Sequence, residues 1–322
     1  MKAAVLYKFG EVPRYEDFPD PSPTQEEVLI KVKAVGFENV DKMMAEGKHF
    51  ASNQFLTELP AIVGFDGIGE LTDGKLVGFG GTKAPYGAMA EKTVVPKTHT
   101  ATIPEGIDAA TAAVLPASAL TSLFPLKWGA KLQKGETVLI NGATGVAGKL
   151  AVQIAKLLGA GRIIGTGRNP DSLKQIMDLG ADAVIDLKQP KGQLSDSFKK
   201  EAKDGYDVIL DFLWGHPTET LINTLIPDEI GYVGNRIRLV QIGEAVGETI
   251  SLPASSLRNS GLEIIGASAG MTPEAINEST NQVWEWLREN KLKMDIEKVP
   301  LKDIESTWKR TDFQGKRIVI VP

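Results

Sequence analysis

Strand-like and helix-like segments alternate along residues 136–268, and this alternation leaves few folds open to the chain. The strand-like segments are short, apolar and rich in β-branched residues; they read ETVLING, GRIIGTG, DAVIDL, GYDVILDFLW, IRLVQIG and LEIIGAS. Two helix-like segments, GVAGKLAVQIAKLLGA and PDSLKQIMDLGA, lie between the first three of them. Such alternation is typical of right-handed βαβ units, which form a parallel sheet covered by helices on both faces.

The first third of the chain has a different pattern. The stretch EVLIKVKAVGF alternates apolar and polar side chains as a half-buried strand does, and further short apolar pieces are separated by glycine and proline. This spacing predicts a small barrel or sandwich of antiparallel strands. An alanine- and leucine-rich segment follows at residues 108–126, and we expect a helix there that is broken at Pro116.

These patterns predict an α/β protein of two domains. The chain ends on a helix, PEAINESTNQVWEWLREN, and a strand, KRIVIVP, which we expect to return to the first domain. A β-rich domain is therefore assigned to residues 1–120 and 270–322, and a doubly wound parallel-sheet domain to residues 121–269. The length agrees, because single cores stop growing at about 250–300 residues.

Composition excludes several classes of function. The net charge of -5 argues against nucleic acid as the main partner. The chain has no cysteine, and its three histidines, His49, His99 and His216, show no metal-ligand spacing, so no metal site is expected. No apolar run looks long enough to span a bilayer, and the first residues turn polar too soon for a signal peptide. We expect no membrane partner and a cytoplasmic location.

The glycine-rich stretch NGATGVAGK follows the first strand of the alternating region. An ATP-binding P-loop would need GxxxxGK followed by Ser or Thr, but here the two glycines are one residue too far apart and Leu150 follows the lysine. The stretch instead matches GxGxxG with alanine at the first position, between a strand and a helix, as dinucleotide-binding turns do. The predicted cofactor-binding residues are Asn141, Ala143, Thr144, Gly145, Val146, Ala147 and Gly148. Glycines placed only for tight packing remain the alternative.

The end of the next strand bears on which dinucleotide is bound. Folds that prefer NAD place an acid there, about 20 residues after the glycines, to bind the ribose 2′-hydroxyl. This chain has Arg168 instead, and an arginine favours the 2′-phosphate of NADP(H). We therefore expect NADP(H) as cofactor, near Thr166, Gly167, Arg168 and Asn169. Arg168 is otherwise a solvated surface arginine, and Asn169 is otherwise only the cap of the helix that begins at Pro170.

Three further residues are assigned from the same edge of the predicted sheet. Trp214 follows a buried strand and is either a platform for a cofactor ring or a core residue. Gly243 lies at the carboxyl end of another parallel strand, where ligands bind in such sheets. Lys149 follows the last glycine of the turn and is expected to point into solvent.

The ordered set of motifs resembles the medium-chain dehydrogenase/reductase superfamily, and within it the zinc-free quinone oxidoreductase branch of zeta-crystallin type. The resemblance runs nearly end to end, through MKAAVLYKFG, EEVLIKVKAVGFENVD, YGAMAEKTVVP, IPEGIDAATAAVLPASALTSLFPL, ETVLINGATGVAGKLAVQIAKLLGA, YDVILDFLWG, LVQIGEAVG and GKRIVIVP. It implies a GroES-like catalytic domain, a Rossmann domain and a cofactor bound in the cleft between them. It also implies a homodimer joined through the last strand of the Rossmann sheet.

The resemblance also indicates where the chain departs from its relatives. Zinc alcohol dehydrogenases of this superfamily carry a cysteine and a GHE segment, where this chain has Gly64-Phe65-Asp66 and no cysteine. The quinone reductases carry Asn-x-x-Asp-x-Tyr in the segment matching FENVDKMM, where only Asp41 is kept. Asn39, displaced by one position, Asp41 and His49 are the candidate catalytic residues. Asp41 is alternatively an anchor of the loop, and His49 an exposed loop histidine.

The resulting functional hypothesis is an NADPH-dependent, zinc-independent reductase of quinones or of activated C=C bonds in α,β-unsaturated carbonyls. A zinc-free carbonyl reductase or alcohol dehydrogenase is the alternative among enzymes. A non-catalytic NADPH-binding protein of crystallin type is the alternative outside them. The expected partners are a small carbonyl or quinone substrate and a second copy of the chain. Gln314 and Lys316 lie in the closing segment and are weaker candidates for the site.

Overall fold

The computed structural model describes residues 1–49, 51–202, 205–226, 236–311, 313 and 315–322. The chain divides into two compact units: unit 1 is Met1–Ala117 with Met294–Pro322, and unit 2 is Ser118–Lys293. The sequence pattern assigns residues 270–322 to the first domain, whereas the structure groups residues 270–293 with unit 2. The reason lies in helix α9 (Pro273–Arg288), where Ser279 Oγ accepts a hydrogen bond of 2.9 Å from Trp128 Nε1.

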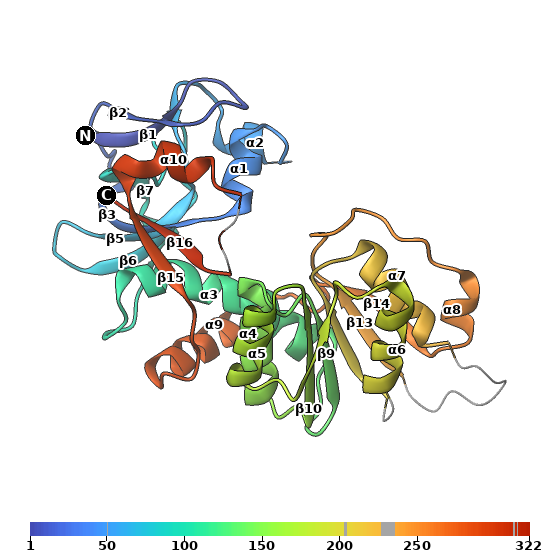
Figure 1. Ribbon diagram of the computed structural model, residues 1–322. Helices are drawn as coiled ribbons and strands as arrows, with labels where there is room; N and C mark the ends of the chain where they lie inside the picture. Colours follow the sequence, from blue (N-terminus) through green and yellow to red (C-terminus); the bar gives the residue numbers. More distant parts are fainter. Residues whose placement is uncertain (50, 203–204, 227–235, 312, 314) are drawn as a thin grey trace. The chain divides into compact units, whose positions relative to one another are not determined.

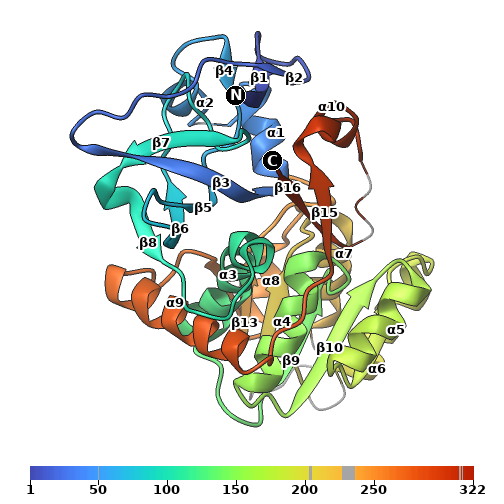
Figure 2. The same cartoon turned by 90° about the vertical axis from the view of Figure 1, so that its left-hand side faces the viewer.

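Unit 1 is built mainly from antiparallel strands, as the sequence predicts. One sheet has the order β2-β1-β4; a larger one has the order β15-β16-β3-β5-β6-β8, with β7 also paired to β3. The long strand β3 crosses the unit beside β7 and β5 (Figure 2). The strands are β1 (Lys2–Leu6), β2 (Arg14–Asp17), β3 (Glu27–Phe37), β4 (Ala61–Ile62), β5 (Asp66–Glu70), β6 (Leu76–Gly80), β7 (Lys92–Pro96), β8 (Thr100–Thr102), β15 (Ile296–Pro300) and β16 (Arg317–Val321).

The core of unit 1 follows from the alternation in β3. Ile30 and Val32 point inward and are buried, while Lys31 between them is exposed. They join one apolar cluster with residues of β1, β6 and β16, such as Leu6, Phe79 and Ile320. The helical turns of unit 1 are short; they are α1 (Asn39–Ala45), α2 (Ser52–Phe55), η1 (Lys97–His99), η3 (Leu301–Asp303) and α10 (Ile304–Trp308).

Helix α3 (Ala109–Phe124) corrects two sequence predictions. It runs through Pro116 without ending there. Proline removes one backbone hydrogen bond, but a helix with a largely buried apolar surface has packing energy to offset that loss. Together with the π-helical turn η2 (Pro125–Gly129), α3 forms the one described helical segment that is long and apolar enough to cross a membrane. In its most apolar window, 61% of the residues are buried inside the protein, as in a core helix.

Unit 2 contains a six-stranded parallel sheet with the order β11-β10-β9-β12-β13-β14. Numbered along the chain, this is the order 3-2-1-4-5-6 of the doubly wound Rossmann fold. The predicted fold class, α/β with a GroES-like unit and a Rossmann unit, is confirmed. The strands are β9 (Thr137–Asn141), β10 (Arg162–Gly167), β11 (Ala183–Asp186), β12 (Val208–Asp211), β13 (Ile237–Gln241) and β14 (Leu262–Gly266).

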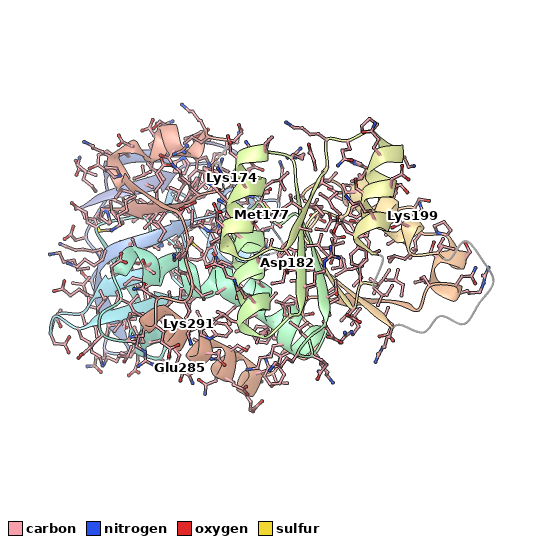
Figure 3. The ribbon with its side chains drawn as sticks, turned by 60° about the horizontal axis from the view of Figure 1, so that its bottom comes forward. Lys174, Met177, Asp182, Lys199, Glu285 and Lys291 are labelled. Atoms are coloured by element: carbon pink, nitrogen blue, oxygen red, sulfur yellow. The ribbon has the colours of Figure 1, made fainter. Side chains whose placement is uncertain are left out.

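Helices cover both faces of this sheet (Figure 1). α4 (Val146–Leu157) packs beside α5 (Pro170–Leu179), and α6 (Lys191–Glu201) packs beside α7 (Gly215–Thr224) on the other face. α8 (Ala254–Arg258) adjoins β14. Figure 3 shows Lys174 and Met177 projecting from α5. Their neighbours Leu173 and Ile176 are buried, so α5 is amphipathic and packs its apolar face on the sheet.

Candidate functional site

The carboxyl edge of the unit 2 sheet is where such folds bind ligands. Strand order reverses between β9 and β12, and ligands bind at such a switch point, outside the carboxyl ends of the strands. Asn141 and Asp211 are partners in register there and are the last residues of β9 and β12. The glycine turn after β9 and the loop after β12 therefore lie on the two sides of the switch point.

The glycine turn has the backbone of a dinucleotide-binding loop. Gly142 has a φ of 95°, and Gly145 caps α4 in an extended conformation. A Cβ on Gly148 would overlap the backbone of Gly142 and Ala143, so this glycine permits the close crossing of helix and turn. A Cβ on Gly145 would meet only the Gly142 carbonyl oxygen, at 3.8 Å, which leaves open space in front of the turn.

The start of α4 completes an anion-binding arrangement. The first N–H groups of a helix have no acceptor within it, and they carry the positive end of the helix dipole. In this turn they belong to Val146 and Ala147, next to the open space at Gly145. A pyrophosphate fits this combination of free backbone donors and a missing side chain. Thr144 lies in the same turn, where its side chain occupies the space that a Cβ on Gly167 would need.

Two of the predicted cofactor residues have no exposed surface. Asn141 and Thr166 are 0% exposed, and Thr166 Oγ1 donates to Asn141 Oδ1 over 2.9 Å. Thr166 Oγ1 also accepts from the backbone N–H of Gly142, at 2.9 Å, and its carbonyl accepts from Ala143 N–H at 2.8 Å. These buried side chains thus support the backbone of the glycine turn and present no polar atoms to solvent.

Of the two predicted residues directly after β10, Asn169 has a structural role and Arg168 is free to bind a ligand. Asn169 is the N-cap of α5, and its Oδ1 accepts from the N–H groups of Asp171 and Ser172 at 2.9 and 3.1 Å. Arg168 is exposed and makes no hydrogen bond or ion pair with any residue that the structure describes. Its guanidinium is therefore available to a ligand at the carboxyl end of β10.

The structure also places the three other residues that the sequence analysis singled out near this edge, Trp214, Gly243 and Lys149. Trp214 is half-buried against the unit 2 core and caps α7 with a φ of 54°. Gly243 N–H donates to Asp211 O at 3.1 Å, and a Cβ on Gly243 would crowd the carbonyl of Phe212. Lys149 is only 7% exposed, contrary to the expectation that it points into solvent, because it lies on the inner side of the first turn of α4.

The candidate catalytic residues lie in unit 1, around α1. Asp41 is buried, and its Oδ2 accepts from Glu38 N–H at 2.7 Å, which forms a capping box at the start of the helix. Asn39 is exposed at the first position of α1. His49 is half-buried, and its Nδ1 accepts from Ala51 N–H at 3.2 Å. The structure therefore gives Asp41 the anchoring role that the sequence left open.

Two carboxyl groups of unit 1 have raised pKa values. Burial raises the pKa of Asp41 well above its usual range, and the nearby Asp66 and Glu38 carboxylates add to this effect. Asp66, the first residue of β5, keeps an exposed side chain. Partial desolvation, and then the Glu38 carboxylate, raise the pKa of Asp66 to about 6.

A small cavity adjoins Asp41 within unit 1. It has a volume of about 20 Å³ and is lined mainly by apolar side chains such as Met44, Phe55, Val63 and Phe65. This is room for a water molecule, which needs about 10–15 Å³, and not for a quinone. Within the described ranges, no three His, Asp or Glu side chains gather in a way that could hold a metal ion. Gln314 lies outside the described residues, and Lys316 is exposed.

Sequence reasoning missed two polar residues of the unit 2 edge, Asp211 and Thr218. Both are 0% exposed, and Thr218 Oγ1 donates to Asp211 Oδ2 over 2.6 Å. A signal for Asp211 was present, since an acid ends the otherwise apolar run VILD. The sequence gives no such signal for Thr218, because a threonine within a helix fits no functional motif unless its hydrogen-bond partner is known.

Comparison with known proteins finds similar sequences among dehydrogenases and quinone reductases. A family model described as zinc-binding dehydrogenase matches residues 147–289. A quinone oxidoreductase of Pseudomonas aeruginosa is 26% identical over 310 residues, covering 90% of this chain and 88% of that protein. A probable NADPH-dependent quinone reductase of Emericella nidulans is 26% identical, with 96% of each chain covered.

Solved structures with this fold include both reductases and dehydrogenases. The quinone oxidoreductase of Thermus thermophilus, solved also in complex with NADPH, is 26% identical with a TM-score of 0.77, and both chains are fully covered. An NAD-dependent alcohol dehydrogenase is 23% identical with a TM-score of 0.81 over the full length of both chains.

A GroES-like unit and a Rossmann unit with a dinucleotide-type turn together define a two-domain oxidoreductase. With the relatives above, the chain is similar to the medium-chain dehydrogenase/reductase superfamily and, within it, to the quinone oxidoreductases.

Proposed function

We propose that this protein is an NADPH-dependent, zinc-independent reductase of quinones or of α,β-unsaturated carbonyls. The observation that carries the proposal is the carboxyl edge of the unit 2 sheet, with its open glycine turn and the free guanidinium of Arg168. When bound, the dinucleotide would supply a hydride from C4 of its nicotinamide ring to a quinone, or to the β-carbon of an enone.

The chain's own residues would bind and orient the cofactor. The backbone N–H groups of Val146 and Ala147 would hold the pyrophosphate, with Gly145 leaving room for it and Gly148 allowing the close turn. Arg168 would pair with the 2′-phosphate, because a guanidinium binds phosphate through two parallel hydrogen bonds. Thr144 and Gly167 would line the same edge, while Asn141, Thr166 and Gly243 would hold its shape.

The cofactor assignment is tested at Arg168. Arg168→Asp should lower the preference for NADPH over NADH by at least about tenfold, since a carboxylate repels the 2′-phosphate and accepts from a 2′-hydroxyl. The ratio of kcat/KM values for the two cofactors measures it, with Lys174→Asp on the exposed face of α5 as the charge-matched control. An unchanged ratio in the Arg168 variant would mean that another residue discriminates.

Zinc independence rests on the chemistry of the available side chains. The sequence has no cysteine, Phe65 stands where zinc enzymes of the superfamily have histidine, and the described residues hold no cluster of three ligand side chains. We therefore expect full activity after dialysis against a strong zinc chelator, and only trace zinc by elemental analysis. Loss of activity that zinc restores would refute this part of the proposal.

The substrate class follows from the same point. Without a Lewis acid, direct reduction of a saturated ketone is harder, because nothing strong polarises the carbonyl oxygen. A quinone or an enone accepts a hydride with weaker help, because the developing charge is delocalised. Asp41 would fix the loop that carries Asn39 and His49, either of which could donate a hydrogen bond to the substrate oxygen.

A carbonyl reductase or alcohol dehydrogenase is the second candidate, since an NAD-dependent alcohol dehydrogenase of Sulfolobus acidocaldarius is 27% identical over 93% of this chain and 92% of that protein. Oxidation of NADPH with a quinone, an enone and a saturated ketone in parallel separates the two. Turnover of the ketone alone would overturn the main proposal. Tight NADPH binding without turnover of any of the three would favour the non-catalytic, crystallin-type alternative. A cytoplasmic location is part of the proposal and is open to cell fractionation.

A further inference from the structure

We infer that Asp211 and Thr218 are positioning residues, which set the geometry of the dinucleotide edge without touching the ligand. The inference rests on the proposed function, in that the ligand is a dinucleotide bound at this edge. Its basis is a buried carboxylate to which the sequence pattern assigns no role. Asp211 has no exposed surface, and a buried charge is costly unless hydrogen bonds replace water.

Four donors meet the Asp211 carboxylate. Oδ1 accepts from Asn141 Nδ2 and Leu213 N–H, both at 3.0 Å, and from Trp214 N–H at 3.2 Å. Oδ2 accepts from Thr218 Oγ1 at 2.6 Å. Hydrogen bonds to an ionised acceptor are among the strongest in proteins. The donors come from β9, from the loop after β12 and from α7, so one side chain ties three segments together.

The network continues to the glycine turn across the switch point. Asn141 Nδ2 also donates to Thr218 Oγ1 at 3.2 Å, and its Oδ1 accepts from Thr166 Oγ1. Thr166 Oγ1 in turn accepts from the backbone N–H of Gly142. A continuous chain of buried hydrogen bonds therefore joins α7 to the first residue of the turn that would hold the pyrophosphate.

The loop after β12 needs such support, because its backbone is strained. Trp214 has φ 54° and ψ -165°, a conformation that a residue with a side chain rarely adopts and that persists only where the surrounding structure holds it. The carboxylate accepts from the N–H groups of Leu213 and Trp214, and Leu213 O accepts from Val246 N–H at 2.8 Å. The loop is thus fixed from both sides at the position where the ligand is expected.

The role is positioning and not contact, because Asp211, Thr218, Asn141 and Thr166 are all 0% exposed. Any effect on the ligand passes through the backbone of the glycine turn and of the strained loop. Removing one donor leaves the Asp211 carboxylate with fewer hydrogen bonds. We then expect the loop after β12 to adopt other conformations besides the one seen here.

The test compares two threonines of α7. Thr218→Val removes the donor to Asp211 and keeps the shape, whereas Thr220→Val is a matched control. Thr220 is buried at 4% exposure, and its Oγ1 donates to His216 O within the same helix. Thr218→Ser restores the hydroxyl. Asp211→Asn is the more direct change, but its amide NH2 group would face the four hydrogen-bond donors around residue 211 and could cause misfolding. The test therefore uses Thr218.

We expect the Kd of NADPH to rise about tenfold in Thr218→Val and to stay within about twofold of wild type in Thr220→Val and Thr218→Ser. Hydrogen exchange at Leu213 and Trp214 should become faster in Thr218→Val only. An unchanged Kd in Thr218→Val, or an equal loss in Thr220→Val, would overturn the inference. Failure of the wild-type protein to bind NADPH would instead overturn the proposed function, which keeps the two failures distinct.

Discussion

Asp41 is a carboxylic acid placed where its charge is poorly solvated. Its carboxylate accepts a backbone hydrogen bond from Glu38 N–H, while the Asp66 and Glu38 carboxylates add negative potential. The pKa of Asp41 is therefore raised in the folded state, and the fold favours the protonated form. From pH 3.8 up to the raised pKa, the folded protein binds more protons than the unfolded chain, so its stability falls as pH rises.

Asp41→Asn should remove this pH dependence. The unfolding free energy of the wild type should fall between pH 5 and pH 8 by more than that of the variant, with a slope of at most about 1.4 kcal/mol per pH unit. Urea denaturation at the two pH values measures the difference. Asp73→Asn, in the exposed turn between β5 and β6, should behave as wild type. Parallel pH profiles for wild type and Asp41→Asn would contradict the burial argument.

Two glycines of the same turn should respond in opposite ways to an added methyl group. Gly148→Ala should cost about 1–3 kcal/mol of stability, because its Cβ would overlap the backbone of Gly142 and Ala143. Gly145→Ala should fold normally, because its Cβ faces open space, yet raise the Kd of NADPH by about tenfold by filling the phosphate approach. Thermal denaturation and cofactor titration of both variants give the four values. Normal NADPH binding by Gly145→Ala would place the pyrophosphate elsewhere.

At the scale of elements, strands were easier to predict than the helices between them. β9, α4, β10, α5 and β11 lie where the sequence predicts them, because each has a clear apolar period. α6 was not predicted: its sequence KGQLSDSFKKE is highly charged, and only Leu194 and Phe198 reach the core. Its place is set by the parallel pairing of the strands, which requires a crossover segment between β11 and β12.

The N-cap of α5 gives an element-scale prediction. Asn169→Ala should lower the unfolding free energy by about 1 kcal/mol, since Oδ1 of Asn169 satisfies the N–H groups of Asp171 and Ser172. Chemical denaturation measures the change, and Asn169→Asp should keep most of the stability because a carboxylate caps equally well. No loss in the alanine variant would show that the cap is replaceable by water.

At the scale of the whole molecule, we propose that the homodimer implied by the sequence resemblance forms through β14. This strand is at the edge of the unit 2 sheet and pairs with β13 alone among the described strands. Ile264 is 38% exposed on it, and the charge of Glu263 is paired with Arg236 across the neighbouring segment. An edge strand of this kind offers unpaired backbone groups and apolar surface to a second copy.

Ile264→Lys should convert this proposed dimer into a monomer at micromolar concentration, because a charge at the edge opposes strand pairing. Light scattering coupled to size-exclusion chromatography measures the mass. Met177→Lys, which adds the same charge at an exposed position of α5, is the control and should remain dimeric. A wild-type protein of monomer mass would refute the dimer outright.

Local sequence patterns were enough to predict the two-part architecture, the strand–turn–helix at residues 137–157 and the glycines that this turn needs. These features depend on neighbours within about ten residues, so local period and residue type are enough to specify them. Arg168 belongs to this class, because its distance from the glycines is fixed by one helix and one strand.

Which polar residues of the site are buried and support its backbone became clear from the folded structure alone. Asn141, Asp211 and Thr218 come from segments about 70 residues apart and meet because parallel pairing brings β9 beside β12. The same holds for α9, which the sequence pattern assigns to the first domain but which packs with unit 2 through Trp128 and Ser279. Such contacts depend on which strands become neighbours, and no local pattern of residues encodes that choice.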